Sequence, residues 1–305
     1  MDKKLPAKGR SKGKASVIDR WLTAGIVIAL IAIALFLWSP LRKYLPREEN
    51  KPAALTKQTE QDRRTGQKER NKIERESTGA GKHALIAILI DDLGQDIKQA
   101  QEALSLPAKM SFAVMPGLPQ SRKIAMLARQ NGSELLLHLP MEPINRNGKR
   151  APIGTLRSDM TPMQFMATLS EDIESVPGAR GVNNHEGSAL TENKEAMKFL
   201  MAELKTRDLF FVDSRTNPKS VAYSTARDFG LKAAKRDVFL DNEIDNPEYI
   251  RERLEELLRI AKKNGSAIAI GHPHPVTIGE LRKWLPTVEE QNVEIVPVSA
   301  LLLKN

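Results

Sequence analysis

Five clusters of polar side chains are spread over the last two-thirds of this chain, and each follows a short apolar stretch. The clusters are ILIDDLG (Asp91, Asp92), LLLHLPMEP (His138, Glu142), GVNNHEGS (Asn183, Asn184, His185), FFVDSRT (Asp213, Ser214, Arg215) and AIAIGHPHP (His272, His274). They hold four of the five histidines of the protein. Apolar runs of this kind are typical of buried parallel strands, whose carboxyl ends converge on one rim in α/β folds. The pattern therefore predicts that distant carboxylates and imidazoles meet at one rim, as in a metal-assisted hydrolase.

The adjacent carboxylates Asp91 and Asp92 follow the most apolar predicted strand, 84–90. Two carboxylates at a strand end can divide the chemistry, with one binding a metal ion and the other taking a proton from water. The alternative interpretation is an Asp turn followed by a helix start, with Gly94 allowing the bend. The pair alone favours neither interpretation.

His138 ends the apolar run ELLLH, and Glu142 follows four residues later. An intervening proline argues against a regular helix, so a strand-to-loop turn is expected to leave the two side chains near each other. His185 is a further candidate metal ligand, and Asn183 and Asn184 offer amide groups to a metal shell or a polar substrate. For His138 the alternative is a buried core histidine, and for GVNNHEGS it is a simple polar turn.

The last two clusters add a candidate general acid and candidate substrate contacts. His272 and His274 alternate with prolines, which fix the backbone and hold the imidazoles in defined directions. One of the two could act as general acid, because an imidazole titrates near the working pH. Asp213 could orient a histidine or bind substrate, and Arg215 could neutralise an anion or a developing oxyanion. A surface Asp–Arg pair is the alternative.

From residue 84 onward, strand-like runs alternate with segments of helical spacing. The predicted strands are 84–90, 111–115, 135–139, 181–183, 209–212, 238–240, 267–270 and 293–298, and the clearest helices are 120–130, 163–176, 193–206 and 247–264. Thr161-Pro162 and Thr191-Glu192 are predicted helix starts, and Asn131-Gly132 and Asn264-Gly265 are predicted helix ends. About seven to eight βα units predict an α/β fold with parallel strands, and the strand-end motifs favour an irregular (β/α) barrel.

The positive charge of the chain is concentrated in its N-terminal part. The whole sequence has 47 Lys and Arg against 38 Asp and Glu, a formal net charge of +9. Residues 1–83 contain 19 of the basic and 9 of the acidic residues, which leaves 28 basic and 29 acidic residues in 84–305. A nearly neutral folded part argues against nucleic-acid binding. The lack of cysteine excludes disulfides and Cys-bound zinc.

An uncharged, mostly aliphatic stretch at 21–39 is predicted to be a single transmembrane anchor. It is long enough to span a bilayer, and Trp21 and Trp38 suit the two membrane interfaces. Seven Lys and Arg residues in segment 1–20 place the N-terminus in the cytoplasm by the positive-inside rule. A cleaved signal peptide is the alternative, but no small-x-small cleavage pattern follows the apolar run.

Residues 40–82 are rich in Lys, Arg, Glu, Gln and Thr and almost free of large apolar side chains. Such a segment cannot bury enough surface to fold, so it is predicted to be a flexible charged linker. The predicted organisation is therefore a basic cytoplasmic segment (1–20), an anchor (21–39), a linker (40–82) and a globular domain (83–305).

Together, the five clusters resemble the polysaccharide deacetylase superfamily, and specifically its divergent bacterial branch. The match runs from residue 85 to residue 301 and rests on the combination of IDDLG, LHLPMEP, GVNNHEGS, FVDSRT and IGHPHP. Members of this superfamily have an irregular (β/α) barrel and remove acetyl groups from N-acetylhexosamines in chitin or peptidoglycan. The resemblance implies the same fold and activity here.

The resemblance also implies roles for individual residues. Asp91 would be the general base, and His272 best matches the general acid. The family has a second metal-binding histidine four residues after the first, where this chain has Glu142. The implied metal ligands are Asp92, His138 and either Glu142 or His185. The substrate contacts, predicted from the residue types alone, are Asn184, Asp213 and Arg215. The implied cofactor is a divalent metal, with zinc the most plausible, which would polarise the amide carbonyl.

Three functions are open at this point. The first is a metal-dependent deacetylase of envelope glycan, such as peptidoglycan, anchored in the bacterial inner membrane through 21–39 with its domain in the periplasm. The second is a noncatalytic periplasmic binding or regulatory protein, favoured by Glu142 and by a domain with one Trp and two Tyr. The third is a phosphoesterase, in which Arg215 would hold the anion.

Overall fold

The computed structural model describes residues 83–145, 148 and 150–302. Within this part of the chain, no helix is both long and apolar enough to cross a bilayer. The predicted cytoplasmic segment (1–20), transmembrane anchor (21–39) and linker (40–82) lie outside the described residues and stay predictions.

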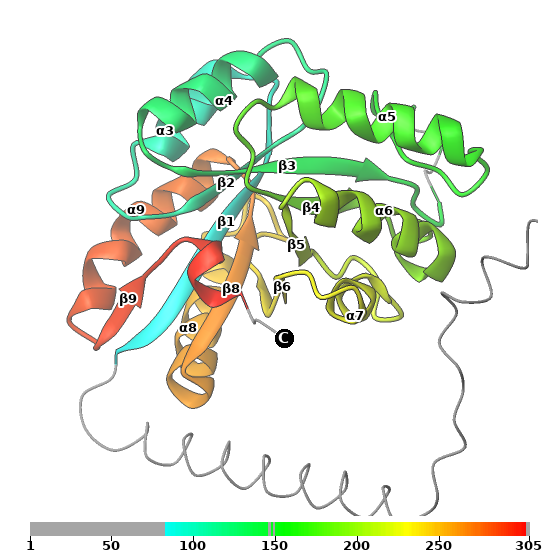
Figure 1. Ribbon diagram of the computed structural model, residues 1–305. Coiled ribbons are helices and arrows are strands. Elements are labelled where there is room, and N and C mark those ends of the chain that lie inside the picture. The colour runs from blue at the N-terminus through cyan, green and yellow to red at the C-terminus, as the bar shows by residue number, and fades with distance from the viewer. Residues whose placement is uncertain (1–82, 146–147, 149, 303–305) are drawn as a thin grey trace, which may run out of the picture. The chain divides into compact units, whose positions relative to one another are not determined.

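A single curled sheet organises the described residues, and all of its strand pairings are parallel (Figure 1). Its strands are β1 (Ala84–Leu93), β2 (Ser111–Val114), β3 (Glu134–Met141), β4 (Gly181–Glu186), β5 (Phe210–Asp213), β6 (Ala233–Lys235), β7 (Val238–Phe239), β8 (Ser266–Gly271) and β9 (Val293–Ile295). The order is β6-β5-β4-β3-β2-β1-β8-β7, and β9 pairs with the first residues of β1. The predicted α/β fold with parallel strands is thereby confirmed, in the form of a curled half-barrel.

The two edge strands of this order, β6 and β7, are joined by only two residues, Arg236 and Asp237. The backbone N–H of Arg236 donates to the carbonyl of Asp213 next to β6, and that of Asp237 donates to the carbonyl of Ile268 in β8. The chain thus leaves β5 and joins β8 between these two residues. In the described part of the chain no pairing links β6 to β7, so the curled sheet is open between them and only the crossing chain joins its two edges. We call this crossing, residues 235–238, the seam.

Helices connect the strands and cover the outside of the sheet (Figure 1). They are α3 (Ile97–Leu104), α4 (Ser121–Gln130), α5 (Pro162–Ser175), α6 (Lys194–Thr206), α7 (Ala222–Asp228), α8 (Pro247–Asn264) and α9 (Pro275–Glu289), with short 3₁₀ turns η1 (Leu190–Glu192) and η2 (Val298–Leu301). The predicted start at Thr161-Pro162 is confirmed, because Thr161 and Gln164 form a reciprocal capping box. The predicted end at Gly265 is also confirmed by a left-handed φ of 86°.

The core has two layers, one between sheet and helices and one inside the barrel. Successive residues of β1 alternate between them: Ile86, Ile88 and Ile90 pack toward the helices, whereas Ala87 and Leu89 pack inside. This strand is therefore buried on both faces, which explains its continuous apolar sequence. The inner layer also contains Val298 of η2.

The structure differs from the predicted elements in three details. Strand β6 was not predicted, since its three residues AAK show no strand periodicity. The predicted strand 293–298 ends at Ile295, because Pro297 precedes the 3₁₀ turn η2. Helix α6 begins after Asn193, which caps it, and Thr191 belongs to η1 instead.

Candidate functional site

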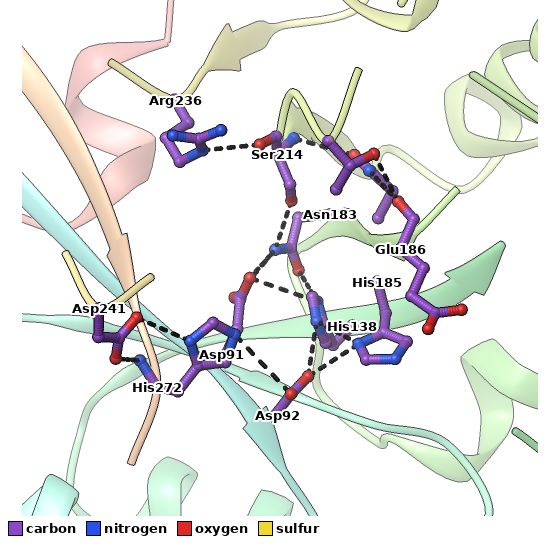
Figure 2. A network of polar contacts seen from close by, with 12 residues as sticks. Asp91, Asp92, His138, Asn183, His185, Glu186, Ser214, Arg236, Asp241 and His272 are labelled. Atoms are coloured by element: carbon purple, nitrogen blue, oxygen red, sulfur yellow. Dashed lines mark hydrogen bonds and ion pairs between the residues drawn. The ribbon is translucent and has the colours of Figure 1, made fainter. Parts of the chain in front are cut away.

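An irregularity in β1 brings both adjacent carboxylates to the same side. The pairing register of β1 with β2 shifts between Ile90 and Leu93, which places the irregular residues at Asp91 and Asp92. Asp92 has a φ of 58°, in the left-handed region that Asp tolerates better than most residues. In a regular strand two successive side chains point to opposite faces, and a bulge re-aims one of them. Both carboxylates therefore take part in one polar network (Figure 2).

Three side chains from separate strands bring potential metal-ligand atoms together. His138 Nε2 lies 3.0 Å from Asp92 Oδ1, His185 Nδ1 lies 2.9 Å from the same oxygen, and the two nitrogens are 3.2 Å apart. A tetrahedral zinc ion with ligand distances near 2.0–2.1 Å has ligand–ligand separations of about 3.3 Å. The triangle is close to that size, so Asp92, His138 and His185 fit a divalent cation of this kind.

Asn183 fixes the orientation of His138 and of Asp91. Its amide nitrogen donates to both carboxylate oxygens of Asp91, each at 2.9 Å, and lies 3.2 Å from the Ser214 hydroxyl. Its amide oxygen, 3.0 Å from His138 Nδ1, must then accept a hydrogen bond from that nitrogen. Neutral His138 consequently has its proton on Nδ1 and a free lone pair on Nε2, the tautomer that a metal ligand needs.

His272 is held by a carboxylate that the sequence analysis did not single out. Its Nδ1 lies 2.9 Å from Asp241 Oδ1, and its backbone N–H donates to Asp241 Oδ2 at 2.7 Å. The hydroxyl of Thr277 donates to the same oxygen. The other ring nitrogen, Nε2, lies 3.8 Å from Asp92 Oδ2 and so points toward the carboxylate pair (Figure 2). Asp241 directly follows the predicted strand 238–240, so the strand-end rule itself was the signal that could have found it.

The other histidine of AIAIGHPHP is placed differently. His274 is the residue before α9, and its ring centroid lies 5.7 Å from that of His272. It also forms a second group of potential ligands with Asp241 and His272. Both oxygens of Asp241 already accept hydrogen bonds, and His272 is the ring that points to Asp92. The geometry therefore favours His272 over His274 as the general acid.

The electrostatics of the cluster separate the roles of the two carboxylates. Burial raises the pKa of Asp91 above its ordinary value, against the opposing charges of His138 and His272. Burial acts to raise the pKa of Asp92 too, but hydrogen bonds from His138 and His185 outweigh it and hold that pKa well below its usual range. Asp92 is thus suited to stay ionised as a ligand, and Asp91 to accept a proton.

Burial would lower the pKa of His272, yet the hydrogen bond and negative charge of Asp241, together with Asp92 and Asp91, raise it to about 9. At neutral pH this imidazole is therefore protonated and able to donate. This environment suits the base and acid roles that the resemblance implies for Asp91 and His272, and both roles stay predictions.

The structure places the remaining predicted residues away from the metal-ligand triangle. Asn184 accepts a hydrogen bond from the backbone N–H of Ser214 and donates to the carbonyl of Glu186, so it ties two loops together. Asp213 accepts from the N–H of Arg215 and from Ser220 within its own loop. Asn184 nevertheless lines the pocket over the cluster, whereas Asp213 is not among the lining residues.

Glu142, the other candidate for third ligand, is also engaged elsewhere. Its Oε2 accepts hydrogen bonds from the backbone N–H and the hydroxyl of Ser158, at 2.8 and 2.6 Å. Of the two alternatives left open by the sequence, the geometry brings His185 to Asp92 and His138.

A pocket of about 360 Å³ opens over the cluster. It is lined by Asp91, His138, Asn184, His185, Glu186, Ser214, Arg215, Thr216, Arg236, Phe239, Asn242 and His272. Arg236, which comes from the seam, was not predicted from the sequence, because a two-residue crossing has no periodic signal. Arg215 lines the pocket as well, consistent with its predicted place near the substrate.

The fold gathers carboxylates and imidazoles at the carboxyl ends of parallel strands, the place where α/β proteins bind their ligands. A family model described as divergent polysaccharide deacetylase matches residues 88–302. The chain belongs to this family, as the sequence motifs predicted.

Relatives of the chain support this assignment. An uncharacterized protein of Escherichia coli strain K12, YibQ, is 36% identical over 217 residues, 71% of this chain and 67% of that protein. An uncharacterized protein of Haemophilus influenzae is 35% identical over 218 residues, 71% of this chain and 76% of that protein. Among solved structures, the uncharacterized protein ATU2773 of Agrobacterium tumefaciens C58 is similar, with 26% identity and a TM-score of 0.69 over 73% of this chain and 91% of that one.

Proposed function

We propose that this chain is a divalent-metal-dependent hydrolase that removes acetyl groups from an N-acetylated polysaccharide of the bacterial envelope, such as peptidoglycan. The observation that carries the proposal is the convergence of a three-residue metal-ligand set, a buried carboxylate and a carboxylate-paired histidine at one rim. A protein with only a structural use for the barrel has no need of that combination.

The residues divide the reaction between them. A divalent cation at Asp92, His138 and His185, with zinc the simplest choice, would supply Lewis-acid polarisation of the acetyl carbonyl and a lower pKa for water. Asp91 accepts the proton of the water that attacks the carbonyl carbon. As the carbon–nitrogen bond breaks, His272 donates its proton from Nε2 to the leaving amine, so that acetate and a free amino sugar are released.

The proposal includes the cellular placement. The uncharged stretch 21–39 and the basic segment 1–20 support a single-pass anchor in the inner membrane with the N-terminus in the cytoplasm. The barrel would then work in the periplasm at the end of the charged linker 40–82.

A noncatalytic binding protein on the same barrel is the second candidate, and one observation favours it. Apart from its histidines, the pocket presents a single aromatic ring, that of Phe239, for stacking on a sugar. If the protein only binds glycan, ligand binding will occur without release of acetate.

The test uses the full chain in detergent, with bound metal measured by elemental analysis and acetate measured after incubation with N-acetylated glycans. We expect one equivalent of metal, lost in Asp92→Ala and in His138→Ala. Asp91→Asn should keep the metal and lower acetate release by about 10²- to 10⁴-fold. A chain that binds no metal when zinc, cobalt and manganese are supplied would overturn the hydrolase proposal.

A paired comparison identifies the third ligand. Structural zinc sites with four ligands bind with about 10–16 kcal/mol, or about 2.5–4 kcal/mol for each ligand. His185→Ala should therefore weaken zinc binding by about 70- to 1000-fold. Glu142→Gln, which keeps an acceptor for Ser158, should leave zinc affinity unchanged. The reverse result would assign the ligand to Glu142.

A further inference from the structure

Arg236 is held in place by backbone carbonyls and an aromatic ring. Its Nε donates to the carbonyl of Ser214 at 2.7 Å, and its Nη2 donates to the carbonyl of Arg215 at 3.0 Å. The ring of Phe239 covers the guanidinium, with its centroid 4.9 Å from Cζ. These contacts hold the side chain at the pocket wall (Figure 2), while its Nη1 has no hydrogen bond to the described residues.

A second guanidinium lines the same pocket. Arg215 directly follows Ser214, has a left-handed φ of 50° and is exposed. Burial and the nearby positive charge of Arg215 lower the pKa of Arg236, against the opposing negative charges of Asp213, Asp91 and Asp237. Among the described residues, neither arginine has an ion pair within 4 Å, although the carboxylates of Asp91 and Glu186 line the same pocket.

The two arginines lie near negatively charged groups of the site. The rim also holds the carboxylates of Asp91, Asp92 and Asp241, which would repel an approaching anion. A guanidinium presents paired N–H groups that match the geometry of a carboxylate, and it binds one more strongly than a neutral acceptor. An arginine fixed beside these carboxylates therefore suits a substrate that itself carries a negative charge.

We propose that Arg236, together with Arg215, forms a subsite for a carboxylate on the substrate, so that the preferred glycan carries an acidic group on or next to the acetylated sugar. This inference rests on the proposed deacetylase function and adds the substrate class. It assigns Arg236 to substrate selection and not to stabilisation of the oxyanion, which forms equally on neutral and acidic substrates.

The experiment compares two forms of one acetylated oligosaccharide, the free carboxylate and its neutral methyl ester. For the full chain, we expect kcat/KM for acetate release to be about 10- to 100-fold higher for the carboxylate form. Arg236→Gln and, independently, Arg215→Gln should remove most of this preference, because each lowers kcat/KM far more on the carboxylate form than on the ester. Arg236→Lys should restore part of it. Arg180→Gln, an exposed arginine just before β4 at the opposite end of the barrel, serves as the matched control.

Each other result overturns the subsite. Equal rates on both forms in the wild type would do so, as would equal losses on both forms in Arg236→Gln and Arg215→Gln. A phosphate-bearing oligosaccharide preferred over the carboxylate would overturn the assignment of the anion.

If no form releases acetate, the proposed function fails, and the subsite is decided by binding of the same two oligosaccharides. A carboxylate preference in affinity that Arg236→Gln and Arg215→Gln both abolish would uphold the subsite alone. Equal affinities for the two forms would overturn it.

Discussion

Asp172 on α5 should make the protein less stable as the pH rises from 4 to 8. Its side chain is 5% exposed, its Oδ2 has no hydrogen-bond partner among the described residues, and it packs against Gly154, where a Cβ would lie 2.0 Å from Oδ1. Burial, helped by the negative charge of Glu171, raises the pKa of Asp172 from 3.8 to about 8. A carboxyl in this setting stays neutral in the folded protein at pH 7.

The sign follows from proton binding. Between pH 4 and pH 8 the unfolded chain loses the Asp172 proton while the folded chain keeps it, so unfolding becomes easier as the pH rises through this window. Below the window both states are protonated, and the stability contribution is fully present. A difference of about 4 pKa units corresponds to about 6 kcal/mol, an upper limit because water can enter the site at high pH.

Urea unfolding of the full chain and of Asp172→Asn at several pH values measures this effect. The amide cannot ionise, so the variant should gain stability relative to the wild type by several kcal/mol between pH 4 and pH 8. Glu174→Gln, an exposed change on the same helix, is the control and should show no such trend. A difference between wild type and Asp172→Asn that stays constant across the window would refute the reasoning.

Three further substitutions test the positions of side chains. Asn183→Leu should weaken metal affinity by about 10- to 100-fold, measured by competition with a chelator, because Asn183 no longer fixes the tautomer of His138. Unchanged affinity would contradict this. Asp241→Asn should lower turnover by at least about 10²-fold at unchanged metal content, because His272 loses its carboxylate, and equal turnover would exclude that role. Gly181→Ala should destabilise the fold by about 1–3 kcal/mol in urea, since a Cβ there would lie 2.3 Å from the ring of Phe210, whereas wild-type stability would mean that the ring moves freely.

The sequence located the rim because strand ends can be read from short apolar runs. Asp91, His138 and His272 all follow such runs, and parallel pairing is enough to bring them together. The long helices were equally accessible, since α8 matches its predicted bounds of 247–264.

Details that depend on side-chain direction were harder to predict. In β4 the alternation of a strand puts residues 183 and 185 on one side and residue 184 on the other. If His185 is a ligand, its companion in the network is therefore Asn183, whereas the sequence analysis chose Asn184 as a substrate contact. Arg236 and Asp241 depend on the short strands β6 and β7, whose assignment requires the tertiary pairing with β5 and β8.

At the seam, side chains add to the backbone hydrogen bonds that join the crossing chain to its neighbouring strands. Asp237 Oδ2 accepts from the N–H of Ile268, and Arg236 donates to two carbonyls after β5, so residue types at two positions help to hold the seam together. Elsewhere, backbone ladders join neighbouring strands whatever their side chains are. A substitution at Arg236 or Asp237 therefore removes contacts that join the crossing chain to its neighbours. Because Arg236 also lines the pocket, a substitution there would change both the opening of the pocket and its charge.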